Sequence, residues 1–449
     1  MTTVPSPLLP PGLSSTVREP LEALLRVSTA LWLTHEPTEL KRVVRRTGIG
    51  QHSISLASYR GVRTFHPFTK ALEKLAETEN VRQALQQSHP EFQGYVVLPG
   101  HTQPLQKSDN LIPTWCLTVA DYVESGATID KAIARFIGEL DEALREKRLI
   151  QWAQMVVSGL SLPEDTDPIR LENGLVMRSM TNDEVSAYAS HDVLSGQSSN
   201  PWQQPNTLLE AEAPLPFHFG TEAQEQMARS SFQEEAQRRA SDVMVALHIA
   251  KPGRATIAST SFQVRPRIFP VPFGHTQWPL TTNAFPSMDL SRADLGAALT
   301  VLTGVLTNVR DEFSLASRRL MDAEHRLSPV DSLMDAAIGL EVLLNPNDSS
   351  ELAFRVALNY ALLSSGSDQR ERYELLRSIQ KIRNRVVHGG LNSTSPDAAL
   401  IHEHAQLACS ALRDALNRFI SDRSLAGNRK LNVEFWLDRI LPPAALRQG

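Results

Sequence analysis

Lys381-Ile382-Arg383-Asn384-Arg385-Val386-Val387-His388-Gly389-Gly390 is the stretch that decides the fold of the last third of the chain. Apolar residues lead into it at intervals of three and four positions, which is the spacing of one buried face of an α-helix. These positions are Leu375, Ile379, Ile382 and Val386. Two glycines close the stretch, and glycine readily takes the left-handed conformation that ends a helix. The sequence therefore predicts a helix that begins near Ser367 and ends here.

Helical patterns continue on both sides of this stretch. Ser291 and Asp294 have the spacing of a capping box, and Ser328-Pro329 fits the N-cap and first position of the next helix. A third helix is predicted over about 351–363, and Ser395-Pro396 opens the fifth. Five amphipathic helices with short connections predict an all-α bundle over residues 291–425. Residues 426–449 are a C-terminal extension.

The part of the chain before the bundle reads as a mixed α/β region with β hairpins. Residues 1–15 are expected to form a flexible tail. Residues 16–150 are expected to be mainly helical, with a strong amphipathic helix over 130–147. Residues 151–290 carry the β signals. The fold class expected for the whole chain is therefore α+β and multidomain.

Turn residues divide the β-containing region. Asn173-Gly174 lies between two short apolar runs and predicts a hairpin, because both turn positions need positive φ. Residues 243–249 read as another strand, and the Lys-Pro-Gly turn after them leads to a strand over 256–264. Residues 191–220 are rich in Ser, Gln, Asn and Pro, which predicts a long polar loop.

The composition is that of an ordinary globular chain. The 449 residues are 41% hydrophobic and 21% charged, which is enough to bury sizeable cores. The net charge of −5 means that any contact with nucleic acid must come from a local patch. Cys116 and Cys409 cannot form a disulfide framework, so a reducing cytoplasm is the expected compartment. We find neither an apolar run of membrane-spanning length nor a signal peptide, and we expect no membrane partner.

Arg383, Asn384 and His388 are the residue types that metal-independent RNA cleavage needs. That reaction requires a base for the ribose 2′-hydroxyl, an acid for the leaving 5′-oxygen and a cation for the charge on phosphorus. Histidine titrates near neutral pH and can be base or acid. Arginine offers a fork of donors to phosphate oxygens, and Asn384 can hold the imidazole or the phosphate. No metal and no cofactor is expected.

Helix geometry poses a difficulty for this site. At about 100° per residue, Arg383 and His388 lie roughly 140° apart on a continuous helix. Either the glycines unwind the helix so that His388 swings back, or two chains pair so that one motif faces the other. The second arrangement also supplies two histidines, one for each proton transfer. The alternative to catalysis is an ordinary helix end, with His388 near the last carbonyls and Arg383 solvated or ion-paired.

The stretch over 331–390 resembles the HEPN superfamily, most closely its Apea-like branch. The resemblance rests on Ala337-Ile338-Gly339-Leu340-Glu341-Val342-Leu343-Leu344, on Phe354-Arg355-Val356-Ala357 and on the ending Arg-Asn-x-x-x-His-Gly-Gly. It covers roughly residues 290–425, about a third of the chain. Two positions depart from the branch: Gln380 stands where a tyrosine is frequent, and Asn384 stands where a serine is frequent. Asparagine is common in active HEPN nucleases.

The resemblance implies a fold, an activity and site residues. Family members are helical bundles that often form homodimers, and many are endoribonucleases of toxin–antitoxin or anti-phage systems. It implies catalytic roles for Arg383 and His388, support from Asn384, and an acidic Glu341 that orients Arg383. The expected partners are an RNA substrate (tRNA or mRNA), a second copy of the chain through the bundle, and a regulatory protein. The alternative is a HEPN module without cleavage activity that binds or dimerises, with sensing in the N-terminal region.

Overall fold

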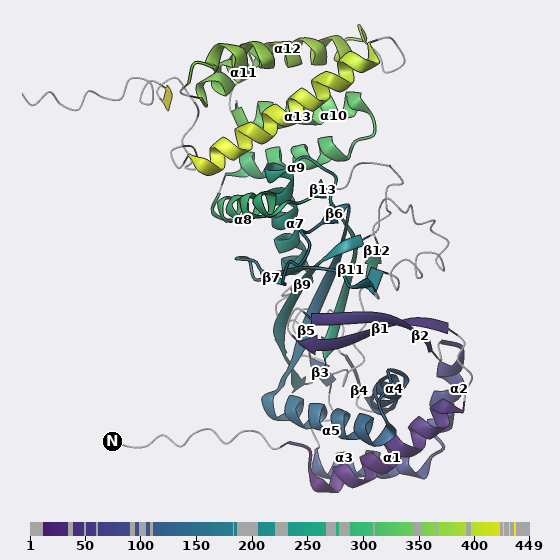
Figure 1. Cartoon of the computed structure of the whole chain (residues 1–449). Helices are drawn as coiled ribbons and strands as arrows, with labels where there is room; N and C mark the ends of the chain where they lie inside the picture. Colours follow the sequence, from purple (N-terminus) through teal and green to yellow (C-terminus); the bar gives the residue numbers. More distant parts are fainter. Residues whose placement is uncertain are drawn as a thin grey trace, which may run out of the picture.

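The computed structural model combines helices and sheets along one elongated molecule (Figure 1). This confirms the expected mixed α+β class. The predicted tail lies mostly outside the described residues, although Ser15 already begins the first helix. The described residues are 12–34, 39–48, 51–59, 62–89, 95–97, 105–107, 111–182, 184–185, 205–220, 232–265, 275–277, 288–308, 310–344, 352–364, 366–391, 397–422, 425, 431 and 435–436.

Five helices of the described residues form the N-terminal end of the molecule. They are α1 (Ser15–Leu33), α2 (Val62–Leu72), α3 (Ala76–Ser88), α4 (Leu111–Glu124) and α5 (Ile129–Glu146). The helix expected over 130–147 is thus confirmed. Their shared core holds Trp32, Trp115 and Phe136, and it also includes Leu215 and Val264 from neighbouring strands. The helices are therefore seated on one end of the central sheet.

An antiparallel sheet of six strands occupies the middle of the chain, in the order β12-β11-β5-β9-β8-β7. Its strands are β5 (Arg148–Ser158), β7 (Ile169–Arg170), β8 (Val176–Ser179), β9 (Pro205–Pro216), β11 (Thr256–Arg265) and β12 (His275–Gln277). The hairpin predicted at Asn173-Gly174 joins β7 to β8. The turn type expected there is wrong: Gly174 has a positive φ of 84° but Asn173 does not. Residues 171–175 connect the strands, and the N–H of Gly174 donates to the carbonyl of Leu171 at 2.9 Å. The strand predicted over 256–264 is also confirmed.

Smaller sheets flank the central one. A hairpin pairs β1 (Glu39–Gly48) with β2 (Gln51–Tyr59). A second sheet joins β3 (Tyr95–Val97), β4 (Leu105–Lys107) and β10 (His218–Gly220). The third pairs β6 (Leu160–Ser161) with β13 (Met288–Asp289) in parallel.

Two predictions for this middle region were wrong. Residues 243–249, expected as a strand, belong to helix α7 (Phe232–Ala250). Val243 through Leu247 are all buried, so the helix has no polar face there and its sequence looks like a buried strand. The expected polar loop at 191–220 contains β9 and β10 from Pro205 onward, and its first residues lie outside the described part. The sequence of β9 contains glutamates and prolines, which disfavour the prediction of a strand. Its buried Glu210 is tolerated because it forms an ion pair with Arg178.

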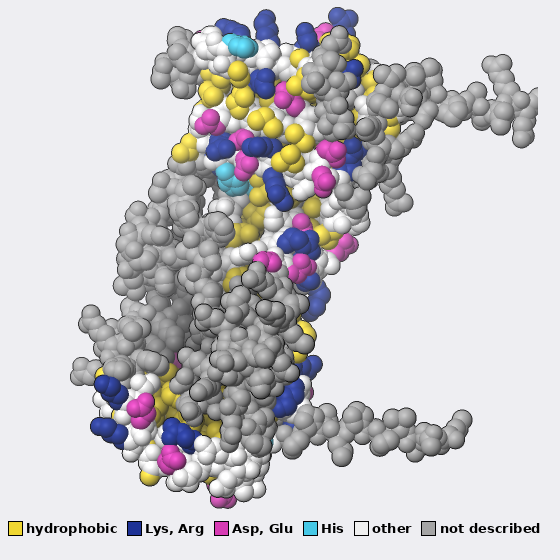
Figure 2. Space-filling model, turned by 180° about the vertical axis from the view of Figure 1, so that it is seen from behind, with side chains coloured by type: hydrophobic (Ala, Val, Ile, Leu, Met, Phe, Trp, Pro, Cys, Tyr) yellow, Lys and Arg dark blue, Asp and Glu magenta, His cyan; other side chains and the backbone are white. Residues whose placement is uncertain are grey.

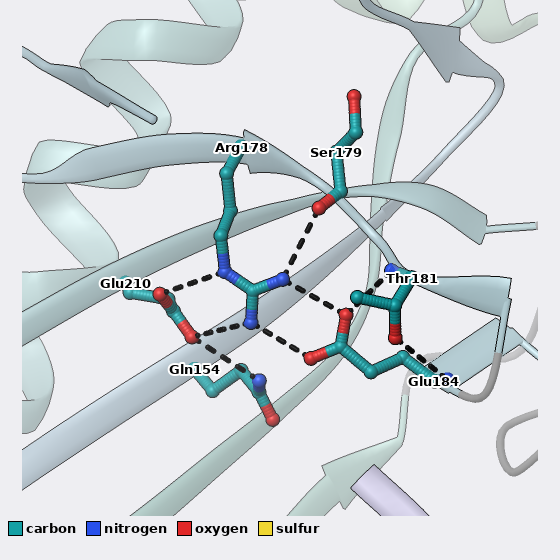
Figure 3. A network of polar contacts seen from close by, with 6 residues as sticks. All are labelled: Gln154, Arg178, Ser179, Thr181, Glu184 and Glu210. Atoms are coloured by element: carbon teal, nitrogen blue, oxygen red, sulfur yellow. Dashed lines mark hydrogen bonds and ion pairs between the residues drawn. The ribbon is translucent and has the colours of Figure 1, made fainter. Parts of the chain in front are cut away.

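That ion pair belongs to a buried network around Arg178 on β8 (Figure 3). The guanidinium donates to both oxygens of Glu184 at 2.8 Å and to both oxygens of Glu210 at 3.1 Å. Gln154 on β5 donates to the same Glu210 at 3.4 Å, and the backbone N–H of Thr181 donates to Glu184 at 2.7 Å. Burial raises the pKa of Glu210, and Arg178 opposes that rise. The network ties the turn after β8 to the middle of the sheet.

Six helices of the described residues make up the C-terminal end of the chain. They are α8 (Arg292–Thr307), α9 (Asp311–His325), α10 (Pro329–Leu344), α11 (Leu352–Leu362), α12 (Gln369–Val387) and α13 (Ala398–Ser421). The capping box at the start of α8 is confirmed, since Ser291 and Asp294 exchange hydrogen bonds of 2.9 and 3.1 Å. The count of five helices was wrong, because α9 follows α8 after a connection of three residues without a glycine or proline.

Candidate functional site

The end of α12 is a regular helix terminus. The N–H of His388 still donates to the carbonyl of Asn384 at 3.0 Å, so the helical winding continues through His388. Gly389 then takes a φ of 72°, and Gly390 donates to the carbonyl of Arg385 at 2.7 Å. This is a Schellman cap, as the paired glycines predict. Local unwinding therefore does not carry His388 round the helix towards Arg383.

Arg383 faces helix α10 rather than open solvent. Its Nη2 lies 3.6 Å from Oε1 of Glu341, and its Nη1 donates to Oδ1 of Asn384 at 3.1 Å. The Arg383 side chain is 26% exposed and that of Glu341 is 19% exposed. Burial raises the pKa of Glu341, and the charge of Arg383 works against this rise. Glu341, the partner that the family resemblance implies for Arg383, thus lies beside its guanidinium, and part of the Arg383 side chain stays exposed to solvent.

His388 and Asn384 lie on another face of α12, where they line a pocket of about 680 Å³ between α11 and α12. The other lining residues are Ala353, Arg377, Ser378, Gln380, Lys381, Arg385 and Gly390. His388 is exposed. In the described part of the chain its imidazole makes no hydrogen bond, not even to the last carbonyls of the helix. It is therefore available to a bound molecule.

One chain thus brings together two of the three predicted catalytic residues. Asn384 and His388 share the pocket, while Arg383 lies beside it and is linked to it by its hydrogen bond to Asn384. Arg383 Nε is buried and has no hydrogen-bond partner among the described residues. Asn384 therefore connects the arginine and the histidine sides of the site.

The pocket is electropositive. Arg377, Lys381, Arg385 and His388 line it, and none of its described lining residues is acidic. Figure 2 shows Lys and Arg side chains gathered at the end of the molecule where α11 and α12 lie in Figure 1. Such a pocket suits an anion. The sequence reasoning missed this row of cations, although their spacing of four residues on a helix could have revealed it.

Ser378, which lies outside the Arg383–His388 motif, also lines the pocket. Ser378 lies 3.0 Å from Nε2 of His404 on α13, and that histidine is buried and also contacts the carbonyl of Leu400 at 2.9 Å. His402 is exposed and turns to Gln406 instead. The two histidines thus diverge, as expected for positions two apart on a helix.

The site consists of an exposed imidazole, an asparagine, an arginine held by a carboxylate, and a cationic pocket. This arrangement can bind a phosphodiester and move a proton beside it. Among the described helices, none combines the length and the apolar character needed to cross a bilayer. The chain matches no protein-family model, and comparisons with curated proteins and with solved structures found no match either.

Proposed function

We propose that the chain is a metal-independent endoribonuclease of the HEPN type that acts in the cytoplasm as a regulated toxin or effector of anti-phage defence. The observation that carries the proposal is the exposed, unbonded imidazole of His388 at the edge of a pocket whose described lining holds cations and no carboxylate. Arg383, fixed by Glu341, supplies a second cation next to it.

The reaction follows from these groups. His388 takes the proton of a ribose 2′-hydroxyl, and the 2′-oxygen attacks the adjacent phosphorus. The bond from phosphorus to the 5′-oxygen breaks, and that oxygen receives a proton from an acid. Arg383 stabilises the charge on the phosphoryl oxygens. The products are a 2′,3′-cyclic phosphate and a 5′-hydroxyl, and DNA is not a substrate because it lacks the nucleophile.

Two copies of the chain complete the site in this proposal. Arg383 and His388 lie on different faces of a helix that stays wound, so a twofold pair can set the arginine of one copy beside the histidine of the other. The imidazolium that forms on His388 in the first step then returns its proton to the leaving 5′-oxygen, so one histidine and one arginine make up each site. The pairing is expected to use the α11 and α12 end, where Phe354, Leu358 and Val387 are exposed apolar residues.

The first test is cleavage of tRNA and mRNA in the presence of EDTA. Arg383→Ala and His388→Ala are each expected to lower the rate at least about a hundredfold, the usual contribution of an acid–base group. Arg318→Ala and His402→Ala are matched controls, because both side chains are exposed on other helices. Equal behaviour of all five proteins would leave a module that binds or dimerises without cleaving.

Mixing the two inactive variants tests the pairing. If one arginine works with one histidine across the twofold axis, a heterodimer of Arg383→Ala with His388→Ala contains one intact combination. Activity should then recover to at most about a quarter of the wild-type level, since half of the dimers are mixed and each has one such combination. Mixed dimers that form and stay inactive would contradict this arrangement.

A further inference from the structure

We propose that Arg377, Lys381 and Arg385 form a phosphate track that holds three successive phosphates of single-stranded RNA beside His388. We further propose that Gln380 accepts a hydrogen bond from a ribose 2′-hydroxyl of the same strand. The inference deepens the proposed function, on which it rests for RNA as the ligand. It names the form of RNA that enters the site.

The spacing of the phosphate track matches a nucleic-acid strand. Its three cations lie four residues apart on α12. Helix geometry therefore places consecutive members about 6 Å apart along the helix axis, with a drift of about 40° around it. Successive phosphates of an extended single strand are similarly separated. All three residues line the same pocket, and His388 follows Arg385 by three residues on that face. A strand that follows the track is thus led to the imidazole.

The cations of the phosphate track are available for a ligand. All three are exposed, and none makes an ion pair with a residue that the structure describes. Other arginines on the same helix are engaged: Arg370 pairs with Glu374, and Arg372 pairs with Asp414. A row of cations that faces a pocket without a described carboxylate binds a polyanion by releasing its condensed counterions.

Gln380 adds a feature that a simple anion does not use. The residue is 7% exposed and lines the pocket, and its Oε1 is buried without a hydrogen-bond partner in the described structure. A buried carbonyl oxygen of this kind is normally bonded. A phosphate oxygen has no proton to give, whereas the ribose that links two phosphates carries a 2′-hydroxyl donor. Gln380 lies next to Lys381, where such a sugar would sit.

The pocket has the size for an unpaired nucleotide rather than for a helix. Its volume of about 680 Å³ lies within the range of about 300–1,000 Å³ typical of small-ligand sites. Ala353 on α11 leaves room on the opposite wall. A strand that enters this pocket must leave its complement, so the phosphate track is expected to select single-stranded RNA over duplex RNA.

Binding to the full chain carrying His388→Ala tests the phosphate track without degradation of the probe. Fluorescence anisotropy is measured with an unstructured labelled RNA, its duplex and the DNA of the same sequence, over a range of salt concentrations. Arg377→Ala, Lys381→Ala and Arg385→Ala should each weaken binding of the single strand and reduce the salt slope by about 0.7, the value for one phosphate contact. Arg318→Ala should leave both unchanged.

Gln380→Leu removes the acceptor and keeps a side chain of similar size. It should weaken binding of the single-stranded RNA by roughly threefold to tenfold and leave the affinity for the DNA of the same sequence unchanged. The phosphate track would be refuted if the salt slope kept its original value in all three track variants. It would also be refuted if duplex RNA bound as well as the single strand. An unchanged preference for RNA over DNA in Gln380→Leu would overturn the ribose contact.

The outcomes separate this inference from the proposed cleavage. Track-dependent binding by a protein that never cleaves RNA in EDTA would support the phosphate track and refute the nuclease. Cleavage that depends on His388, with track variants that bind and cleave like the wild type, would refute the phosphate track alone.

Discussion

Glu341 shows how a single residue can serve the site at a cost to the fold. Its carboxylate lies 3.6 Å from Arg383, and burial keeps its pKa above the usual value despite that charge. A raised pKa means that the contribution of this group to stability is present below its unfolded pKa and is lost as the pH rises through the folded pKa. Above its folded pKa the ionised Glu341 therefore destabilises the fold.

Glu341→Gln is expected to separate stability from activity. At pH 7 the free energy of unfolding should be unchanged or higher, because the amide needs no charge in a half-buried place. Cleavage should fall in kcat by up to about a hundredfold, as expected when a misplaced group leaves its productive position, while KM stays constant. Denaturant unfolding and steady-state kinetics measure the two. A parallel loss of stability and activity would show that Glu341 is merely structural.

Residue types alone predicted part of the candidate site. Arg383, Asn384 and His388 were predicted because their chemistry matches one reaction and a double glycine marks the end of their helix. The roles that we propose for Arg377 and Gln380 could not be predicted in the same way. A cation on a helix is ordinarily solvated, and Gln380 looked only like a departure from a family pattern. Both residues became candidates for ligand binding only because they line the pocket between α11 and α12.

At the scale of elements, α5 and α12 were predicted from their polar and apolar faces, whereas α9 was missed although it has a polar face too, and the buried part of α7 was taken for a strand. α5 and α12 alternate buried and exposed residues, and both were predicted. Residues 243–249 of α7 are buried between the sheet and the C-terminal helices, so this apolar run gives no helical period. The strand β9 carries Glu210, whose burial depends on Arg178 from another strand. Such a long-range partner cannot be seen in a local window of sequence.

The start of α8 offers a test at this scale. Hydrogen bonds from Lys251 and from Ser291 lower the pKa of Asp294 to about 2. A lowered pKa means that the stabilisation is present above the unfolded pKa and is lost as the pH falls through the folded pKa. Asp294→Asn should therefore destabilise the protein at pH 7 and have a much smaller effect near pH 2. Denaturant unfolding of both proteins across this range checks it, and an equal difference at every pH would contradict it.

At the scale of the whole molecule, α7 joins the sheet to the C-terminal helices. One hydrophobic core runs from Met155 and Leu209 on the strands, past Met244 on α7, to Leu340 and Leu412 on α10 and α13. Within the described residues the core is continuous between these parts. The sheet and the C-terminal helices are therefore expected to unfold together.

A buried ion network lies at this junction. His248 on α7 is fully buried, and its Nδ1 contacts Glu324 on α9. The same carboxylate accepts from Arg413 on α13, and Arg413 Nε donates to the carbonyl of His248 at 2.9 Å. The His248 Nε2 lies 3.0 Å from the carbonyl of Ala255, which leads into β11. Helices α7, α9 and α13 and the segment at Ala255 are thus connected through the contacts of Glu324 and His248.

Removing that carboxylate should weaken the molecule as a whole. Glu324→Ala leaves Arg413 buried without its partner, which typically costs roughly 3–5 kcal/mol. The double variant Glu324→Leu with Arg413→Met fills the space with apolar atoms and removes the buried charge, so it should be more stable than Glu324→Ala. Circular dichroism in denaturant gives both free energies of unfolding. If the double variant were the less stable of the two, an unpartnered buried arginine would not be the cause of the stability lost in Glu324→Ala.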